Sequence, residues 1–158
     1  RDHMLVEVLE QNARRNELEP ADIDLEITES AVMVDPDHCI RLISLLRDRG
    51  YGVSIDDFGT GHSSLAYLQK LRVSALKIDQ AFVKTLASDP NNQKIVRAIL
   101  SLAKSLGLET VAEGVEDERA VALLREWGCD YGQGYGLHRP APSHDLLHFI
   151  EERQRAPR

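Results

Sequence analysis

The sequence lacks a long apolar segment, an excess of positive charge and more than two cysteines. No apolar run reaches the roughly 18 residues that a membrane-spanning helix needs, so no crossing segment is predicted. The formal net charge is −7, which disfavours DNA or RNA polymers as partners, because their phosphates attract basic surfaces. With only Cys39 and Cys129, a disulfide framework is not expected, and a reducing cytoplasm fits.

Several common catalytic signatures are also absent. Gly132-Gln133-Gly134 is too short for a dinucleotide-binding or P-loop signature. No serine or cysteine stands next to an evident base, and the six histidines are not expected to form a zinc site. A small phosphate-bearing substrate stays possible, provided that metal ions supply positive charge locally.

The composition and the pattern of the chain indicate one α/β domain. Apolar residues make up 42% and charged residues 28%, as in ordinary globular proteins. The apolar periodicity predicts strands over 22–27, 51–57, 74–79, 108–113 and 129–135. Helices are predicted over 3–16, 36–49, 63–71, 90–106, 117–127 and from 143 until a frayed tail begins at 151.

Several residues support these assignments. Asp35-Pro36 and Asp89-Pro90 are helix starts, with aspartate as the N-cap and proline in the first turn. Ser63 and Ser64 can cap the short third helix. The inward face of the first helix is expected to carry Leu5, Val8 and Leu9. The inward face of the last helix is expected to carry Leu146, Leu147 and Ile150.

Regular alternation of helices and strands with short connections predicts parallel strands and right-handed crossovers. The fold class is therefore α/β, either a partial TIM-like barrel or an open doubly wound sheet. Five strands are too few to close a barrel of eight.

Ionisable residues collect at the carboxyl ends of the predicted strands, where parallel α/β folds place their chemistry. The stretch 53–61 ends a strand in the adjacent carboxylates Asp56 and Asp57, followed by two glycines. Such a pair needs a positive neighbour, and a divalent cation is the simplest one. The other strands contribute Glu26 with Glu29, Lys77, Glu113 and Gln133.

This set is suited to phosphodiester hydrolysis. Carboxylates from three strands could hold one or two cations, with Asp56 placed to bridge two and Asp57 to bind one. Lys77 would neutralise developing charge or hold the attacking water. A solvated acidic turn is the plain alternative for the Asp56-Asp57 pair alone, but it leaves the other strand ends unexplained.

Five motifs in order resemble the signatures of the EAL-domain family across nearly the whole chain. They are Leu25-Glu26-Ile27-Thr28-Glu29-Ser30, Asp56-Asp57-Phe58-Gly59-Thr60-Gly61-His62-Ser63-Ser64-Leu65, Leu76-Lys77-Ile78-Asp79, Val111-Ala112-Glu113-Gly114-Val115-Glu116 and Gly132-Gln133-Gly134-Tyr135. The resemblance implies a modified TIM barrel that hydrolyses the bacterial second messenger cyclic di-GMP to linear pGpG with Mg²⁺ or Mn²⁺. His62 stands where the family more often has tyrosine, with little expected consequence.

The resemblance also implies residue roles. Glu26 matches a ligand of the first metal, Asp56 the bridging ligand, and Asp57 and Glu113 ligands of the second metal. Lys77 matches the lysine that positions the catalytic water, and Gln133 a polar residue near that water. Glu29 matches the anchor of the loop after Asp57, which the family ties to dimerisation. Glu116 is similar to an acid that supports the metal ligands or faces the substrate; its plain alternative is a charge at a helix N-terminus. Asp79 is assigned likewise to the support of the metal ligands, and its plain alternative is a strand-end cap.

The chain departs from the family pattern in one respect. The Glu-Ala-Leu motif and an asparagine ligand, both expected upstream of Arg1, are absent from the sequence. Residues 1–158 are thus interpreted as the C-terminal two-thirds of such a domain, truncated at its N-terminus, with weak metal binding and little turnover alone. A non-catalytic cyclic di-GMP receptor is the alternative. A homodimer, and regulatory sensor or GGDEF-type domains in a possibly membrane-anchored parent protein, are further expectations.

Overall fold

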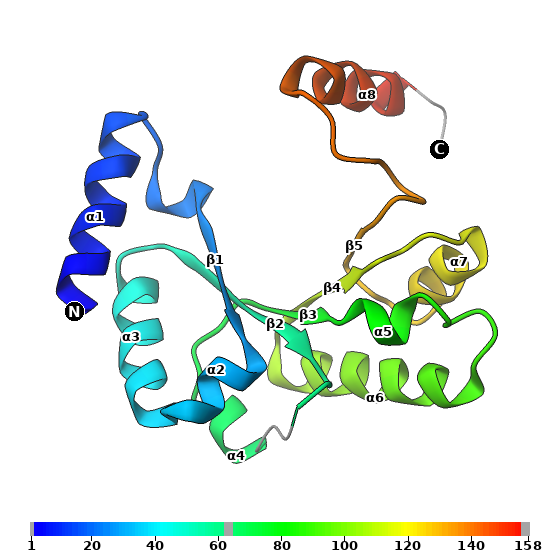
Figure 1. The fold of residues 1–158 in the computed structure, drawn as a ribbon, viewed down its shortest axis with the longest axis horizontal. Coiled ribbons are helices and arrows are strands. Elements are labelled where there is room, and N and C mark those ends of the chain that lie inside the picture. The colour runs from blue at the N-terminus through cyan, green and yellow to red at the C-terminus, as the bar shows by residue number, and fades with distance from the viewer. Residues whose placement is uncertain (1, 62–64, 156–158) are drawn as a thin grey trace.

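The computed structural model describes residues 2–61 and 65–155, and its centre is one parallel β-sheet. Each strand pairs with the next in chain order (Figure 1). The strands are β1 (Asp24–Thr28), β2 (Gly52–Phe58), β3 (Ala75–Ile78), β4 (Glu109–Glu113) and β5 (Tyr131–Gln133). This arrangement confirms the predicted α/β class with five parallel strands. The sheet is open, with β1 and β5 as the edge strands of the described chain.

Helices precede, separate and follow the strands. A 3₁₀ turn, η1 (Pro20–Asp22), replaces the predicted start of the first strand. None of the helices within the described residues is long and apolar enough to cross a bilayer. The helices are α1 (Asp2–Arg15), α2 (Glu29–Val34), α3 (Pro36–Asp48), α4 (Leu65–Leu68), α5 (Gln80–Val83), α6 (Pro90–Leu106), α7 (Glu118–Glu126) and α8 (Ser143–Arg155).

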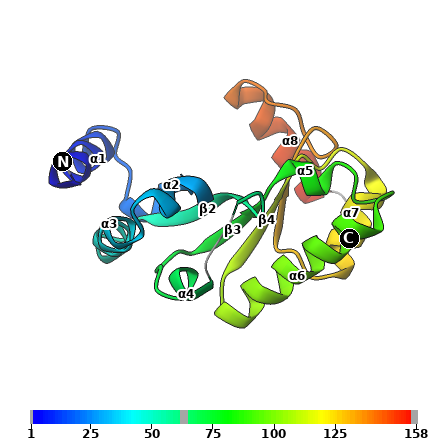
Figure 2. The same cartoon turned by 60° about the horizontal axis from the view of Figure 1, so that its bottom comes forward.

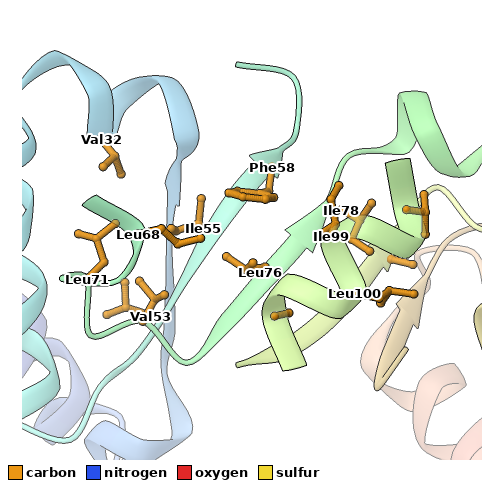
Figure 3. Packing of buried hydrophobic residues seen from close by; sticks show 14 of the residues in the cluster. Val32, Val53, Ile55, Phe58, Leu68, Leu71, Leu76, Ile78, Ile99 and Leu100 are labelled. Carbon is orange, nitrogen blue, oxygen red and sulfur yellow. The ribbon is translucent and has the colours of Figure 1, made fainter. Parts of the chain in front are cut away.

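The hydrophobic core lies between the sheet and one helical layer. Helices α3, α4 and α6 lie on the same face of the sheet in two views (Figures 1 and 2). Alternate residues of β2 and β3 point toward these helices because successive strand residues face opposite sides. Figure 3 shows this packing, in which Ile78 of β3 lies beside Ile99 of α6. Burial of each such side chain contributes about 1.5–3 kcal/mol.

Aspartate caps fix where three of the helices begin. Asp35 accepts a hydrogen bond from the backbone N–H of His38, and Asp89 accepts one from Asn91, which confirms the two predicted Asp-Pro starts. Asp117 caps α7 in the same way. Because these caps satisfy N–H groups that have no partner inside the helix, each helix starts at a defined distance from the preceding strand.

Three details of the sequence interpretation are wrong. Leu5 and Val8 of α1 are 45% and 49% exposed, whereas Val6 is buried, so α1 packs through a different stripe. The apolar residues predicted inward on α8 are exposed, and α8 stands away from the sheet, continuing to Arg155 without fraying at 151 (Figure 1). The sequence interpretation also lacks helices α2 and α5, although Thr28 caps α2 directly after β1 and Asp79 caps α5 directly after β3. The predictions for residues 62–64 lie outside the described residues.

Candidate active site

Strand register places the functional side chains on the sheet face opposite the helical core. Paired residues in neighbouring strands point to the same side. Glu26 pairs with Ser54, two residues before Asp56, and Lys77 pairs with Val111, two residues before Glu113. Glu113 in turn pairs with Gln133 at the end of β5. Four strands therefore carry Glu26, Asp56, Lys77 and Glu113 toward one place, as the strand-end argument predicts.

Lys77 stands at the centre of this place. Its Nζ atom lies 2.6 Å from Oε1 of Glu26, 2.7 Å from Oε1 of Glu113 and 3.3 Å from Oδ1 of Asp56. One ammonium thus contacts carboxylates from β1, β2 and β4. The amide of Gln133 donates a hydrogen bond of 3.3 Å to the same oxygen of Glu113. These five residues form one polar network around the lysine, which we call the lysine cluster.

The lysine cluster keeps Lys77 charged although the side chain is buried. Burial alone lowers the pKa of a lysine, because it removes water from the ammonium. The hydrogen bonds to Glu113 and Glu26 and the charge of Asp56 outweigh that effect and leave the pKa above its ordinary value. Lys77 is therefore a fixed cation and hydrogen-bond donor at neutral pH, and it has no lone pair to act as a base.

Asp57 reaches the site through an irregular stretch of β2. The pairing register with β3 shifts between Ile55 and Phe58, and Asp57 has a φ of +55°. The backbone N–H of Asp57 donates a 3.0 Å hydrogen bond to Oδ1 of Asp56. A hydrogen bond to the carboxyl of Asp79 raises the pKa of Asp57, and burial and the charges of Asp56, Asp79 and Glu113 act in the same direction.

The carboxylates at this edge could hold a divalent cation. Asp56, Asp57 and Glu113 each offer an oxygen, and these oxygens lie within 4.8 Å of one another. Their donor chemistry suits hard cations such as Mg²⁺ or Mn²⁺, which prefer oxygen ligands. Glu26 is not in this group of three, although Lys77 links it to two of the members. The donor set fits a metal, and Lys77 supplies only part of the positive charge that the carboxylates need.

Glu29 holds the glycine-containing loop that follows Asp57. Its side chain is buried at the start of α2, and Oε2 accepts hydrogen bonds from the backbone N–H groups of Gly59 at 2.8 Å and Gly61 at 3.3 Å. A Cβ atom at Gly61 would lie 2.8 Å from Oε1 of Glu29, so any larger residue here would push the carboxylate of Glu29 aside. The loop residues nearest Asp57 are therefore tied to β1 and α2.

Two further predicted residues lie beside the lysine cluster. Asp79 follows β3 and caps α5 by accepting a 2.7 Å hydrogen bond from the backbone N–H of Ala81, a position that fits the alternative of a strand-end cap, and it also contacts the carboxyl of Asp57. Glu116 lies 3.5 Å from Nζ of Lys84 in an exposed ion pair. It stands one residue before the N-cap of α7, so its position also fits the alternative of a charge near a helix start.

A pocket of about 860 Å³ adjoins the lysine cluster through Glu113 and Gln133. Its wall includes Tyr135, with the guanidinium of Arg139 4.8 Å from the ring centre. The sequence interpretation assigned no substrate-binding residue and did not single out Lys84 or Arg139. The sequence did contain a signal for them. Lys84 follows Asp79 by five positions and Arg139 follows Gln133 by six, so both lie on segments just beyond the ends of β3 and β5.

Known proteins with the same organisation identify the family. The family model of the EAL domain matches residues 1–140. The chain is 46% identical over 143 residues to a protein of Pseudomonas aeruginosa named bifunctional diguanylate cyclase/cyclic di-GMP phosphodiesterase MucR. It is 44% identical over 128 residues to cyclic di-GMP phosphodiesterase NbdA of the same species. These matches cover 90% and 81% of this chain, and 21% and 16% of the relatives.

Solved structures agree with the sequence matches. The MucR phosphodiesterase in complex with c-di-GMP superposes with a TM-score of 0.87 at 45% identity, over 90% of this chain and 58% of that one. The EAL domain of Mycobacterium smegmatis DcpA superposes with a TM-score of 0.86 at 40% identity, over 96% of this chain and 68% of that one. The chain belongs to the EAL-domain family, and it spans about a fifth of the length of MucR and about a sixth of that of NbdA.

Proposed function

We propose that this chain is part of a metal-dependent phosphodiesterase domain that hydrolyses cyclic di-GMP to linear pGpG. The observation that carries the proposal is the contact of one buried ammonium, that of Lys77, with carboxylates from three other strands. A cationic donor among oxygen ligands suits a phosphodiester, whose charge must be neutralised while water attacks the phosphorus. The names of the relatives support the choice of substrate.

From the donor set we propose ligand positions for a two-metal site. Glu26 and Asp56 would hold one Mg²⁺ or Mn²⁺, and Asp56, Asp57 and Glu113 the other, with Asp56 shared. Bound cations supply a lowered pKa for water and charge neutralisation at phosphate oxygens. Glu26 is half exposed, and this chain spans 58% and 68% of the two solved EAL chains. We therefore infer that residues outside this sequence complete the first metal's ligands.

The chain's own residues have distinct tasks in the hydrolysis. Water adds to phosphorus, the bond from phosphorus to the 3′ oxygen breaks, and that oxygen takes up a proton. Lys77 orients the water and the phosphate as a hydrogen-bond donor, because its raised pKa keeps it protonated. Glu113 accepts the proton from water, and Gln133 orients Glu113 through its amide. The pocket beside Glu113 has room for part of the dinucleotide.

A product assay tests this proposal. The intact parent protein is incubated with cyclic di-GMP and Mg²⁺ or Mn²⁺, and pGpG is measured by chromatography. We expect turnover in the parent, little in residues 1–158 alone, and a loss of at least about a hundredfold in the parent carrying Lys77→Met. Lys94→Met is the matched control, because Lys94 is exposed on α6 and lies outside both the lysine cluster and the lining of the pocket. Unchanged pGpG formation by Lys77→Met contradicts the proposed role.

A cyclic di-GMP receptor without turnover is the second candidate. Binding of the nucleotide by calorimetry, together with no pGpG from the intact parent at saturating metal, would favour it. The retained residues of the lysine cluster favour the enzyme, since a receptor needs no lysine held among carboxylates. We also propose a homodimer for the intact domain, which light scattering tests. A cytoplasmic location would keep Cys39 and Cys129 reduced, and both are free thiols in this structure.

A further inference from the structure

Helix α8 carries a histidine pair that the proposed phosphodiester chemistry does not use. His144 and His148 are four residues apart in α8, which runs from Ser143 to Arg155. Residues at this spacing are neighbours on one side of a helix, with Cβ atoms about 5–6 Å apart. The expectation that no histidines form a zinc site overlooked this spacing in the sequence His144-Asp145-Leu146-Leu147-His148.

The pair faces away from the protein body. Successive helix residues are rotated by about 100°, so His144 and His148 lie within roughly 40° of each other, nearly opposite Leu146 and roughly 100–140° from Phe149. Leu146 and Phe149 line the pocket beside the lysine cluster. Both histidines are exposed, with 79% of the His144 side chain accessible. A cation can therefore reach the two imidazoles from solvent without displacing the core.

A carboxylate lies next to His144. Nε2 of His144 lies 3.2 Å from Oδ1 of Asp145. Metal-binding histidines commonly place the N–H of one ring nitrogen on a carboxylate, which leaves the lone pair of the other nitrogen for the cation and makes it more basic.

We propose that His144 and His148 form a second metal site, which takes a borderline transition-metal cation such as Zn²⁺. Two neutral imidazoles prefer Zn²⁺, Cu²⁺ or Ni²⁺ to Mg²⁺, whereas the carboxylates of the lysine cluster prefer hard cations. The two sites therefore differ in the ion that they select. A cation that joins residues four apart also fixes the first turns of α8, whose opposite face lines the pocket.

Zinc titration in the presence of excess Mg²⁺ tests the pair directly. Excess Mg²⁺ competes with Zn²⁺ for the oxygen ligands, and calorimetry on the 158-residue chain assigns to the pair the Zn²⁺ binding that is lost when a histidine is replaced. We expect one Zn²⁺ per chain, and a loss of affinity of about tenfold or more in each of His144→Ala and His148→Ala. Leu147→Ala is the matched control, because Leu147 is exposed on α8 and has no ligand atom. Circular dichroism verifies that each variant is folded.

A second readout follows the helix itself. Zn²⁺ is expected to slow amide hydrogen exchange over residues 144–148 in the wild type and in Leu147→Ala, but in neither histidine variant. The proposal is overturned if the wild type binds no Zn²⁺ beside Mg²⁺, or if either histidine variant binds Zn²⁺ as the wild type does. Neither readout depends on hydrolysis, so this test and the test of the phosphodiesterase proposal can fail separately.

Discussion

Replacing Lys77 by methionine should destabilise the protein in the absence of divalent cations. Methionine retains most of the buried aliphatic stem and removes the ammonium that contacts Glu26, Asp56 and Glu113. Three carboxylates would then face one another without their shared counter-charge. Because the ammonium is almost fully buried, water cannot replace it without opening the sheet face.

The size of the effect follows from how deeply the ammonium of Lys77 and its carboxylate partners are buried. Removal of one partner from a buried ion pair costs about 3–5 kcal/mol. The lower end applies here, because Glu26 is half exposed and can turn toward water. We therefore expect a loss of about 3 kcal/mol, or roughly 6–12 °C in Tm for a chain of this size. Since the pKa of Lys77 lies above its ordinary value, this contribution is fully present below about pH 10 and is lost only above it.

Urea unfolding with and without Mn²⁺ measures this effect. Mn²⁺ at about a hundredfold excess over its Kd stabilises a folded site by about 2.7 kcal/mol, so it should recover most of the loss in Lys77→Met if the carboxylates bind the ion. Lys84→Met should differ from the wild type by no more than about 0.5 kcal/mol under either condition. Equal unfolding midpoints for Lys77→Met and the wild type without metal would refute the reasoning.

Three further changes test other parts of the site. Gly61→Ala should lower the free energy of unfolding by about 1 kcal/mol or more and speed amide hydrogen exchange at residues 59–61, because the added Cβ would crowd the carboxylate of Glu29. Unchanged exchange would contradict the role of Glu29 in holding this loop. Asp79→Asn retains the cap of α5 but removes a negative charge beside Asp57, so an NMR titration should find a lower pKa for Asp57. An equal or higher pKa would count against the contact between Asp57 and Asp79. Thr110→Val should lower the free energy of unfolding in urea by about 1–3 kcal/mol, because the buried hydroxyl of Thr110 in β4 donates a hydrogen bond to Asp130, just before β5. The affinity for Mn²⁺ should stay unchanged, and an altered affinity would show that the two regions are coupled.

The sheet could be predicted because its signals are local. Apolar strands alternate with capped helices, and Asp35-Pro36 and Asp89-Pro90 fix two helix starts within a residue. Which side of a helix is buried depends on the element that covers it, and the sequence of the helix alone does not contain that information. In α1 the apolar residues surround much of the helix, so Val6 could not be distinguished from Leu5 and Val8 as the core residue.

The sequence indicated which residues gather at the candidate site, but it did not indicate which of them contact one another. Strand ends indicated which residues meet, because parallel strands deliver their carboxyl ends to one edge. The number of carboxylates on Lys77 depends on register between strands separated by crossover helices. The second partner of Asp57, Asp79, depends on the irregularity in β2, for which the sequence offers only two adjacent aspartates.

That irregularity explains how neighbouring carboxylates can serve one site. In a regular strand, Asp56 and Asp57 would point to opposite faces of the sheet. The register shift and the φ of +55° at Asp57 break this alternation and bring both carboxylates near Glu113. A non-glycine residue in this conformation costs about 1–2 kcal/mol. The hydrogen bond from the Asp57 N–H to Asp56 and the hold of Glu29 on the following loop oppose that cost. A glycine would remove the strain at position 57 but also the carboxylate, so the strain supports the proposal that Asp57 is a metal ligand.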